Sequence, residues 1–91
     1  MLFMIIERFR GGSATPVYER VRERGRMLPD GLHYIHSWVD ASFSRSFQLM
    51  ECDDLSVLLA WISQWNDLVD FEVVPVVSSG QASAVAIGLR D

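Results

Sequence analysis

Residues 32–39 read LHYIHSWV and decide the fold, because the strand that they predict is apolar on both of its sides. Side chains of a strand alternate between its two faces. One face therefore takes Tyr34, His36 and Trp38. The other takes Ile35, Ser37 and Val39. A sheet with one wet face would alternate apolar and polar residues cleanly, so each face here needs a cover.

The same two-sided pattern occurs at residues 1–6 and at residues 71–77. Only two helices are clearly indicated by the sequence, and two helices cover one face of a sheet. A second copy of the chain is the simplest cover for the other face. The expected partner is therefore the chain itself, in a homodimer packed sheet to sheet.

Composition predicts one soluble globular domain. The chain has 91 residues, 49% of them hydrophobic and 22% charged, which is ordinary for such a protein. Its net charge of −4 disfavours binding to nucleic acid or to an anionic membrane, because both need clustered positive charge. We expect neither kind of partner.

Cysteine usage predicts a reducing compartment. Cys52 is the single cysteine, so it has no second thiol for a disulfide or a CxxC site, and the cytoplasm is expected. The apolar run at residues 1–6 is too short for a signal peptide or a membrane span. His33 and His36 are three apart in a strand and point to opposite faces, so no metal site and no cofactor are expected.

Periodicity and turn residues predict the order strand, helix, strand, strand, helix, strand. The strands are expected at about residues 2–9, 32–40, 45–52 and 69–78. Pro75 lacks a backbone donor, which places the last strand at an edge of the sheet. This is the order of the ferredoxin-like α+β fold, with four antiparallel strands and both helices on one face. We expect this domain to span residues 1–78.

The first helix is predicted to begin at Thr15, as its cap, with Pro16 in the first turn, and to run to Leu28 before the turn at 29–31. The second is predicted to begin at Asp53–Asp54, where negative charge suits a helix N-terminus. It carries two adjacent apolar stripes. They are Leu55, Leu58, Leu59 and Ile62, and Val57, Trp61 and Trp65. Residues 79–91 form a tail for which a short helix over 82–87 and an irregular chain are equally good predictions.

A hairpin register follows if Asp40 pairs with Arg45. One face would then carry aromatic residues and a titratable group, with Trp38 opposite Phe47, His36 opposite Leu49 and Tyr34 opposite Glu51. The other face would carry Ser37, Gln48 and Glu7. We expect the helices to cover the face with Ile35, Ser37 and Val39, which leaves Tyr34, His36 and Trp38 for a cavity at the dimer interface.

Five stretches resemble a bacterial family, domain of unknown function 3303. They are YER at 18–20, RGRMLPDGL at 24–32, SWVD at 37–40, FQLME at 47–51 and WNDLVDFEVVPVV at 65–77. The resemblance covers residues 1–78 and implies a chain of the dimeric α+β barrel type. That superfamily includes cofactor-free monooxygenases, small isomerases, haem-degrading enzymes and non-catalytic proteins. The family itself brings no activity with it.

No motif in the sequence specifies a reaction, so no catalytic residue is assigned and the question of an enzyme stays open. The candidate cavity residues are Tyr34, His36, Trp38, Gln48 and Glu51. The leading hypothesis is a small-molecule-binding or interaction module, whose aromatic cavity either holds a small apolar metabolite or is closed by packing. The alternative is a cofactor-independent monooxygenase or isomerase, in which His36 is the weak candidate for a general base. Trp61 and Trp65 fit either the core or a stacked ligand.

Overall fold

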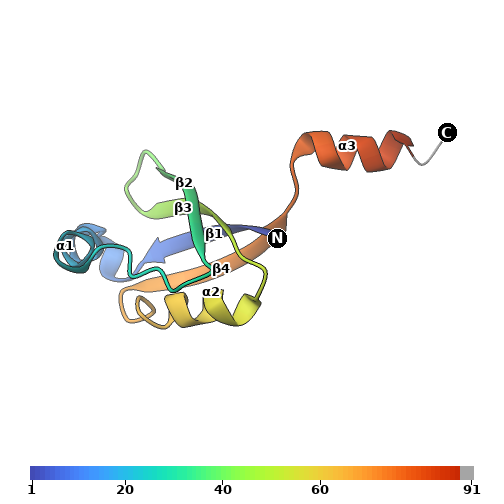
Figure 1. The fold of residues 1–91 in the computed structure, drawn as a ribbon. Helices are drawn as coiled ribbons and strands as arrows, with labels where there is room; N and C mark the ends of the chain where they lie inside the picture. The colour runs from blue at the N-terminus through green and yellow to red at the C-terminus, as the bar shows by residue number, and fades with distance from the viewer. Residues whose placement is uncertain (89–91) are drawn as a thin grey trace.

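Four strands and two helices follow the predicted order in the computed structural model, which describes residues 1–88 (Figure 1). They are β1 (Leu2–Phe9), α1 (Thr15–Arg24), β2 (His33–Val39), β3 (Arg45–Glu51), α2 (Leu55–Ile62) and β4 (Val69–Val76). A short 3-10 turn, η1 (Arg10–Gly12), follows β1, and a third helix, α3 (Ser79–Gly88), follows β4. The sheet is antiparallel with the order β2-β3-β1-β4, which confirms the α+β fold and its βαββαβ arrangement. Pro75 lies in an edge strand, as predicted.

The hydrophobic core lies between one face of the sheet and the helices α1 and α2. Ile5, Met50 and Leu58 are completely buried there, and Trp61 and Val69 are nearly so. The alternation of β1 explains this arrangement, because its odd-numbered residues from position 3 to position 9 are buried and the intervening ones up to position 6 are only half-buried. The sheet therefore has a covered face, toward the helices, and an open face.

Helix α1 is shorter than predicted. It ends at Arg24 because Gly25 takes a φ of 67°, a left-handed conformation that stops the helix, and Leu28 lies in the segment beyond it. Thr15 is not the cap: its backbone N–H instead donates to the hydroxyl of Ser13 at 3.2 Å.

Helix α2 begins as predicted, with the Asp54 carboxylate accepting the backbone N–H of Ser56 at 2.9 Å. The burial of its apolar residues does not follow the two predicted stripes. Trp61 and Leu58 turn toward the sheet, whereas Leu55 and Leu59 are about half exposed. The predicted aliphatic stripe is thus split, because two indole rings fill the space nearest to the sheet.

The hairpin of β2 and β3 has the predicted register at its turn but not at its far end. Trp38 pairs with Phe47 and His36 pairs with Leu49, as expected, but a β-bulge at Ile35 shifts the residues before it by one position. His33 therefore pairs with Glu51, and Tyr34 pairs with Met50 instead of Glu51. The prediction that Tyr34 shares a face with His36 and Trp38 is wrong, because the bulge inserts one residue between them.

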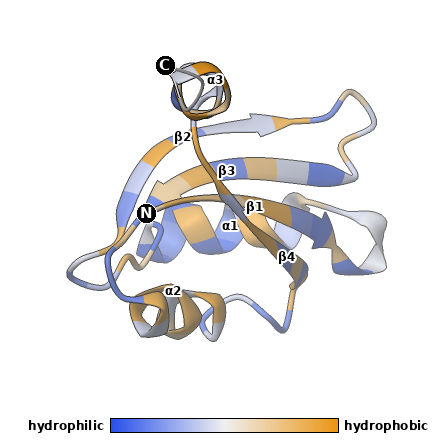
Figure 2. Cartoon of the chain, turned by 90° about the vertical axis from the view of Figure 1, so that its right-hand side faces the viewer, coloured by the Kyte–Doolittle hydropathy of each residue, from blue (hydrophilic) through white to orange (hydrophobic). Residues whose placement is uncertain are grey.

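The open face of the sheet is mainly apolar. Its central members come from all four strands and are Leu2, Met4, Ile6, His36, Trp38, Phe47, Leu49, Val74 and Val76. The register also places polar or charged residues on this face, and they are Arg8, His33, Arg45, Glu51, Asp70 and Glu72. Trp38 is 47% exposed and Ile35 in the bulge is 46% exposed. Charged residues lie at both ends of this face: Arg8 pairs with Glu72 at 3.1 Å at one end, and Glu51 lies beside Leu2 at the other. Figure 2 shows that hydrophobic residues occur along the strands of the sheet.

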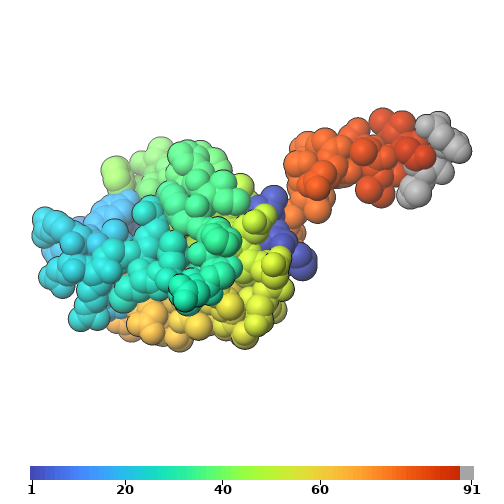
Figure 3. All heavy atoms as spheres, viewed as in Figure 1, coloured from blue at the N-terminus to red at the C-terminus, as the bar shows by residue number. Residues whose placement is uncertain are grey.

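Helix α3 stands apart from the rest of the described chain (Figures 1 and 3). The tail prediction left open a short helix over 82–87, and the helix is present and longer, from Ser79 to Gly88. All of its residues are exposed. Within residues 1–88, no helix is long and apolar enough to cross a membrane.

Candidate functional site

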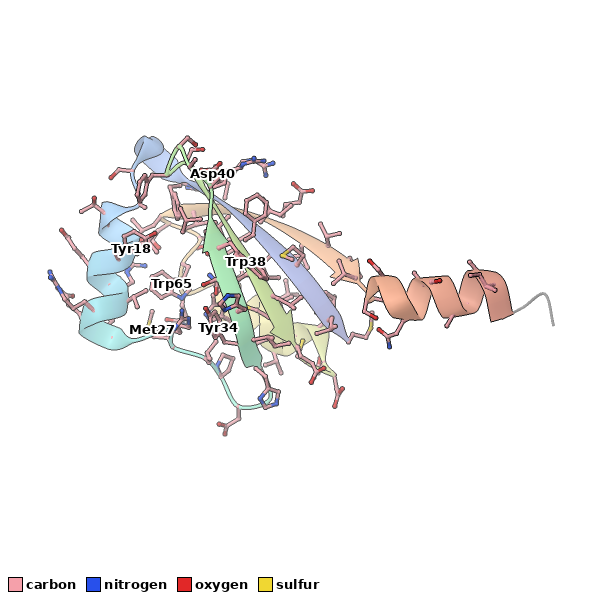
Figure 4. The ribbon with its side chains drawn as sticks, turned by 90° about the horizontal axis from the view of Figure 1, so that it is seen from above. Tyr18, Met27, Tyr34, Trp38, Asp40 and Trp65 are labelled. Atoms are coloured by element: carbon pink, nitrogen blue, oxygen red, sulfur yellow. The ribbon has the colours of Figure 1, made fainter. Side chains whose placement is uncertain are left out.

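A cavity of about 140 Å³ lies between α1 and the covered face of the sheet and opens to solvent. Its apolar walls are Phe9, Val17, Val21, Val39, Trp61 and Trp65, with Tyr18 at the α1 side. Polar groups come from the sheet and from the segment after α1, and they are Glu7, Ser37, Ser46, Gln48 and Arg26. Figure 4 shows Tyr18, Trp65 and Tyr34 between α1 and β2.

The polar floor of the cavity is built by two adjacent strands. Glu7 on β1 is opposite Ser46 on β3, and the Gln48 amide, two residues along, donates a hydrogen bond to the Glu7 carboxyl group. Glu7 is only 4% exposed, and burial raises the pKa of its carboxyl group, against the lowering effect of hydrogen bonds from Gln48 and Ser46 and of the Arg26 charge. Glu7 is thus a buried carboxyl group that holds a proton more readily than an exposed one.

The other end of the Gln48 amide has no matching partner. Its Oε1 atom is buried and accepts no hydrogen bond from any group in residues 1–88. A buried acceptor without a donor costs about 1–3 kcal/mol. The floor therefore contains a carboxyl group and, within the Gln48 side chain, a buried carbonyl oxygen without a donor, next to an apolar space.

At the mouth of the cavity, the Arg26 backbone accepts hydrogen bonds from two tryptophan side chains. The indole N–H groups of Trp61 and Trp65 both donate to the Arg26 carbonyl oxygen, at 2.9 Å and 3.3 Å. The Arg26 guanidinium lies 3.8 Å from the centre of the Tyr34 ring, a cation–π contact. Tyr34 in turn shares a 2.6 Å hydrogen bond with Ser37. These contacts place a positive charge at the mouth and the carboxyl group at the floor.

The size of the cavity limits what it can enclose. An apolar protein cavity of about 150 Å³ is known to hold one benzene molecule. At about 140 Å³, this cavity has room for a single six-membered ring. A larger ligand would leave the rest of its body at the mouth, near Arg26 and Tyr18.

The sequence-predicted site residues lie on two sides of the sheet. Gln48 lines the cavity, and Tyr34 adjoins it through Arg26. His36 and Trp38 lie on the open face, where the edge of one ring meets the other with centres 4.8 Å apart. Glu51 is exposed at the far end of the hairpin. The structure thus does not bring the five residues into one cavity.

Sequence reasoning placed Ser37, Gln48 and Glu7 on one face, and the structure confirms that grouping. It missed Ser46 and Arg26. The alternation signal for Ser46 was present, because Ser46 and Gln48 are two apart in one strand. Arg26 gave no such signal, since it lies in an irregular segment. Trp61 and Trp65 belong to the core and also form the cavity wall.

The fold and this cavity define a small α+β domain of ferredoxin-like topology, with a polar-floored cavity between its helices and its sheet. The chain belongs to the family described as domain of unknown function 3303 (DUF3303), whose model matches residues 1–90. The match confirms the family predicted from the sequence and extends it past residue 78. No curated protein and no solved structure gives a significant match. Within residues 1–88, no three His, Cys, Asp or Glu side chains are grouped to hold a metal ion.

Proposed function

We propose that the protein is a homodimeric module that binds a small, mainly apolar molecule in the cavity between α1 and the sheet. The observation that carries this proposal is the polar floor, where Glu7 and Gln48 line an apolar space and the buried Oε1 atom of Gln48 has no hydrogen-bond donor. Binding sites for small molecules combine apolar walls with a few convergent polar groups in this way. In a packed core, buried polar atoms normally have a hydrogen-bond partner, so an unsatisfied acceptor needs another explanation.

The floor also suggests the chemistry of the ligand. A ligand hydroxyl or N–H group would satisfy Gln48 or donate to Glu7, and its ring would pack between Val21 and Trp65. The best fit is a single ring that carries a hydrogen-bond donor. An anionic substituent elsewhere on the molecule would meet Arg26 at the mouth.

The homodimer is supported by the open face of the sheet. Leaving a large apolar side chain fully exposed forfeits roughly 1.5–3 kcal/mol. Of the nine mainly apolar residues on this face, His36 and Trp38 are exposed and the other seven are half-buried, so each of those seven contributes a part of this amount. Association itself costs an estimated 4–15 kcal/mol or more, which that many side chains from two subunits can outweigh. Light scattering should report a dimer at micromolar concentration, and a stable monomer would contradict this part of the proposal.

A second candidate function is proton transfer by a cofactor-independent isomerase or monooxygenase. One observation favours it, namely that burial raises the pKa of Glu7 at the floor of the cavity. A carboxyl group shifted in this direction exchanges a proton with a bound substrate more readily near neutral pH. Glu7 replaces His36 as the candidate base, because His36 lies on the open face and does not line the cavity.

Cytoplasmic localisation is also proposed. Its support is Cys52, which is buried just beyond β3 as a free thiol. Free buried cysteines are usual in reducing compartments.

The binding proposal is tested with phenol as a probe, because it offers one ring and one donor. We expect a titration of isotopically labelled protein to give saturable NMR shifts at Ser46, at the Gln48 side-chain amide and in α1. Val21→Trp, which fills the cavity, should abolish these shifts. Glu23→Trp is the matched control, since it adds the same side chain on an exposed position of α1. Saturable shifts that survive in the Val21→Trp variant would overturn the assignment of the site.

A further inference from the structure

We infer that α3 is an exchanged arm, which leaves its own subunit and packs on the open face of the partner subunit's sheet. The inference rests on the proposed homodimer and adds to it a second contact surface. The occupant of the open face is thus a second copy of this chain, with its sheet and its α3 together.

Helix α3 has nothing in its own subunit to stabilise it. Val85 and Ile87 are each 62% exposed, and α3 supplies no member of the core within residues 1–88. Isolated helices shorter than about 12–15 residues are marginal in water. Gly80 and the two β-branched residues reduce the helix propensity further. A helix of this kind needs packing against another surface.

The start of α3 is fixed close to the sheet. The Gln81 backbone N–H donates to the Ser78 hydroxyl at 3.0 Å, and the Ser78 backbone N–H donates to the Gln81 side chain at 3.1 Å. This pair is a capping box. Val77 alone separates the cap from Val76, the last residue of β4. Such a short connection leaves no room for a turn that would fold α3 back over its own sheet while the cap is kept.

The direction of α3 favours a partner on the open face. The helix continues beyond the end of β4 and stands on the side of the sheet opposite to α2 (Figures 1 and 2). That is the side on which a second subunit would lie if the two open faces met. An arm that leaves the sheet on this side would run along the partner.

The surface of α3 is apolar on opposite sides. Val85 and Ile87 are two residues apart, which is about 200° around a helix. Residues 79–88 include no charged side chain. Its polar residues are Ser79, Gln81 and Ser83. A helix that exposes large apolar side chains on opposite sides loses free energy in water unless both sides are covered. An interface between two subunits covers both sides of such a helix, whereas a flat surface would cover only one.

The area of the open face is also small for a stable dimer interface, and contacts of the arm would enlarge it. Four strands about 4.8 Å apart and eight residues long give about 500 Å² on each subunit, or about 1,000 Å² in total. Specific interfaces bury about 1,600 Å² in total, and 1,000 Å² is the lower limit. Each ten-residue arm, about 15 Å long and 10 Å wide, would bury about 300 Å² with its contact surface. Two arms that lie at the margin of the open faces, beyond the area in which the two sheets meet, bring the total to the usual size.

The test compares two double variants of the full chain. Val85→Asp with Ile87→Asp places charge on both sides of α3, and Val85→Ile with Ile87→Val keeps the same apolar side chains as the matched control. We expect the aspartate variant to raise the dimer dissociation constant at least about 100-fold, measured by analytical ultracentrifugation. The control should stay within about twofold of the native protein.

A second measurement locates the arm directly. In a dimer mixed from labelled and unlabelled subunits, NMR contacts between subunits should connect the Val85 and Ile87 methyl groups with the Trp38 or Phe47 ring. If the aspartate variant dimerises with the same dissociation constant as the native protein, the proposal that α3 packs on the partner is overturned, and the proposed homodimer is unaffected. Contacts found only within one subunit would do the same. A native protein that is monomeric would overturn both.

Discussion

The Gln48 amide donates a hydrogen bond to the buried carboxyl group of Glu7, from one central strand to its neighbour. The two residues come from β3 and β1, 41 positions apart. They are diagonal neighbours, because Gln48 pairs with Ile5, two residues before Glu7, and side chains two apart in a strand share a face. This contact joins the core of the sheet to the floor of the cavity. Its consequences for stability and for binding can be measured separately.

The first prediction concerns the pH dependence of stability. Burial raises the pKa of Glu7 in the folded state above its ordinary value of 4.5, so the folded protein binds this proton more tightly than the unfolded chain does. The contribution of Glu7 to the free energy of unfolding therefore falls as pH rises above 4.5, until the folded-state pKa is passed. The Glu7→Gln variant has no carboxyl group to ionise at this position, so its free energy of unfolding should not fall in this way. Over that pH range, the variant should therefore become more stable relative to the native protein.

Urea unfolding of both proteins between pH 4 and pH 8 measures this difference. Glu19→Gln on the exposed side of α1 is the control and should follow the native curve. A Glu7→Gln variant whose advantage is the same at every pH would contradict the role of burial.

The second prediction concerns the two indole donors to Arg26. Trp61 is 2% exposed and donates at 2.9 Å, whereas Trp65 donates at 3.3 Å. Trp61→Phe should lower the free energy of unfolding by about 1–3 kcal/mol, from the lost hydrogen bond and the space left behind. Trp65→Phe is the matched comparison and should cost less. An equal or larger loss in Trp65→Phe would show that the distance to the Arg26 carbonyl does not rank the two bonds.

The third prediction concerns the end of α1. Gly25 has φ 67° and ψ −163°, a conformation that is essentially restricted to glycine. Gly25→Ala should therefore lower the free energy of unfolding by about 1–3 kcal/mol, although no heavy atom lies within 4 Å of the added carbon. Gly80→Ala in α3 is the control, where alanine should be neutral or favourable to the helix. A Gly25→Ala variant as stable as the native protein would contradict the strain.

The sequence was sufficient to predict the fold because its signals are local. Apolar alternation predicted the four strands, Pro75 predicted the edge strand, and the acidic pair before Leu55 predicted the start of α2. The bulge at Ile35 was not predictable, since it changes pairing without any glycine or proline to mark it. That single inserted residue moved Tyr34 to the helix side.

The site was only partly predictable for a related reason. Strand alternation grouped Gln48 with Ser37 and Glu7. The expectation that the helices cover the side with Ser37 and Val39 agrees with the structure, but the bulge leaves Ile35 46% exposed. Arg26 reaches the cavity through two tertiary hydrogen bonds to its carbonyl oxygen, and periodicity carries no information about such contacts. The aromatic residues of β2 attracted attention in the sequence, whereas the structure places the enclosed polar groups on the other side.

The central claim is that the polar floor selects a donor-bearing ring, and the preference for phenol over toluene tests it most directly. The two probes have nearly the same shape, and one net hydrogen bond of about 0.5–1.5 kcal/mol corresponds to a preference of about 2- to 13-fold. NMR titrations of the native protein should show phenol binding more tightly than toluene by such a factor, and Gln48→Leu should reduce the preference, with the Glu7 carboxyl group left as an acceptor. Equal binding of the two probes by the native protein, or a preference unchanged in Gln48→Leu, would contradict the account.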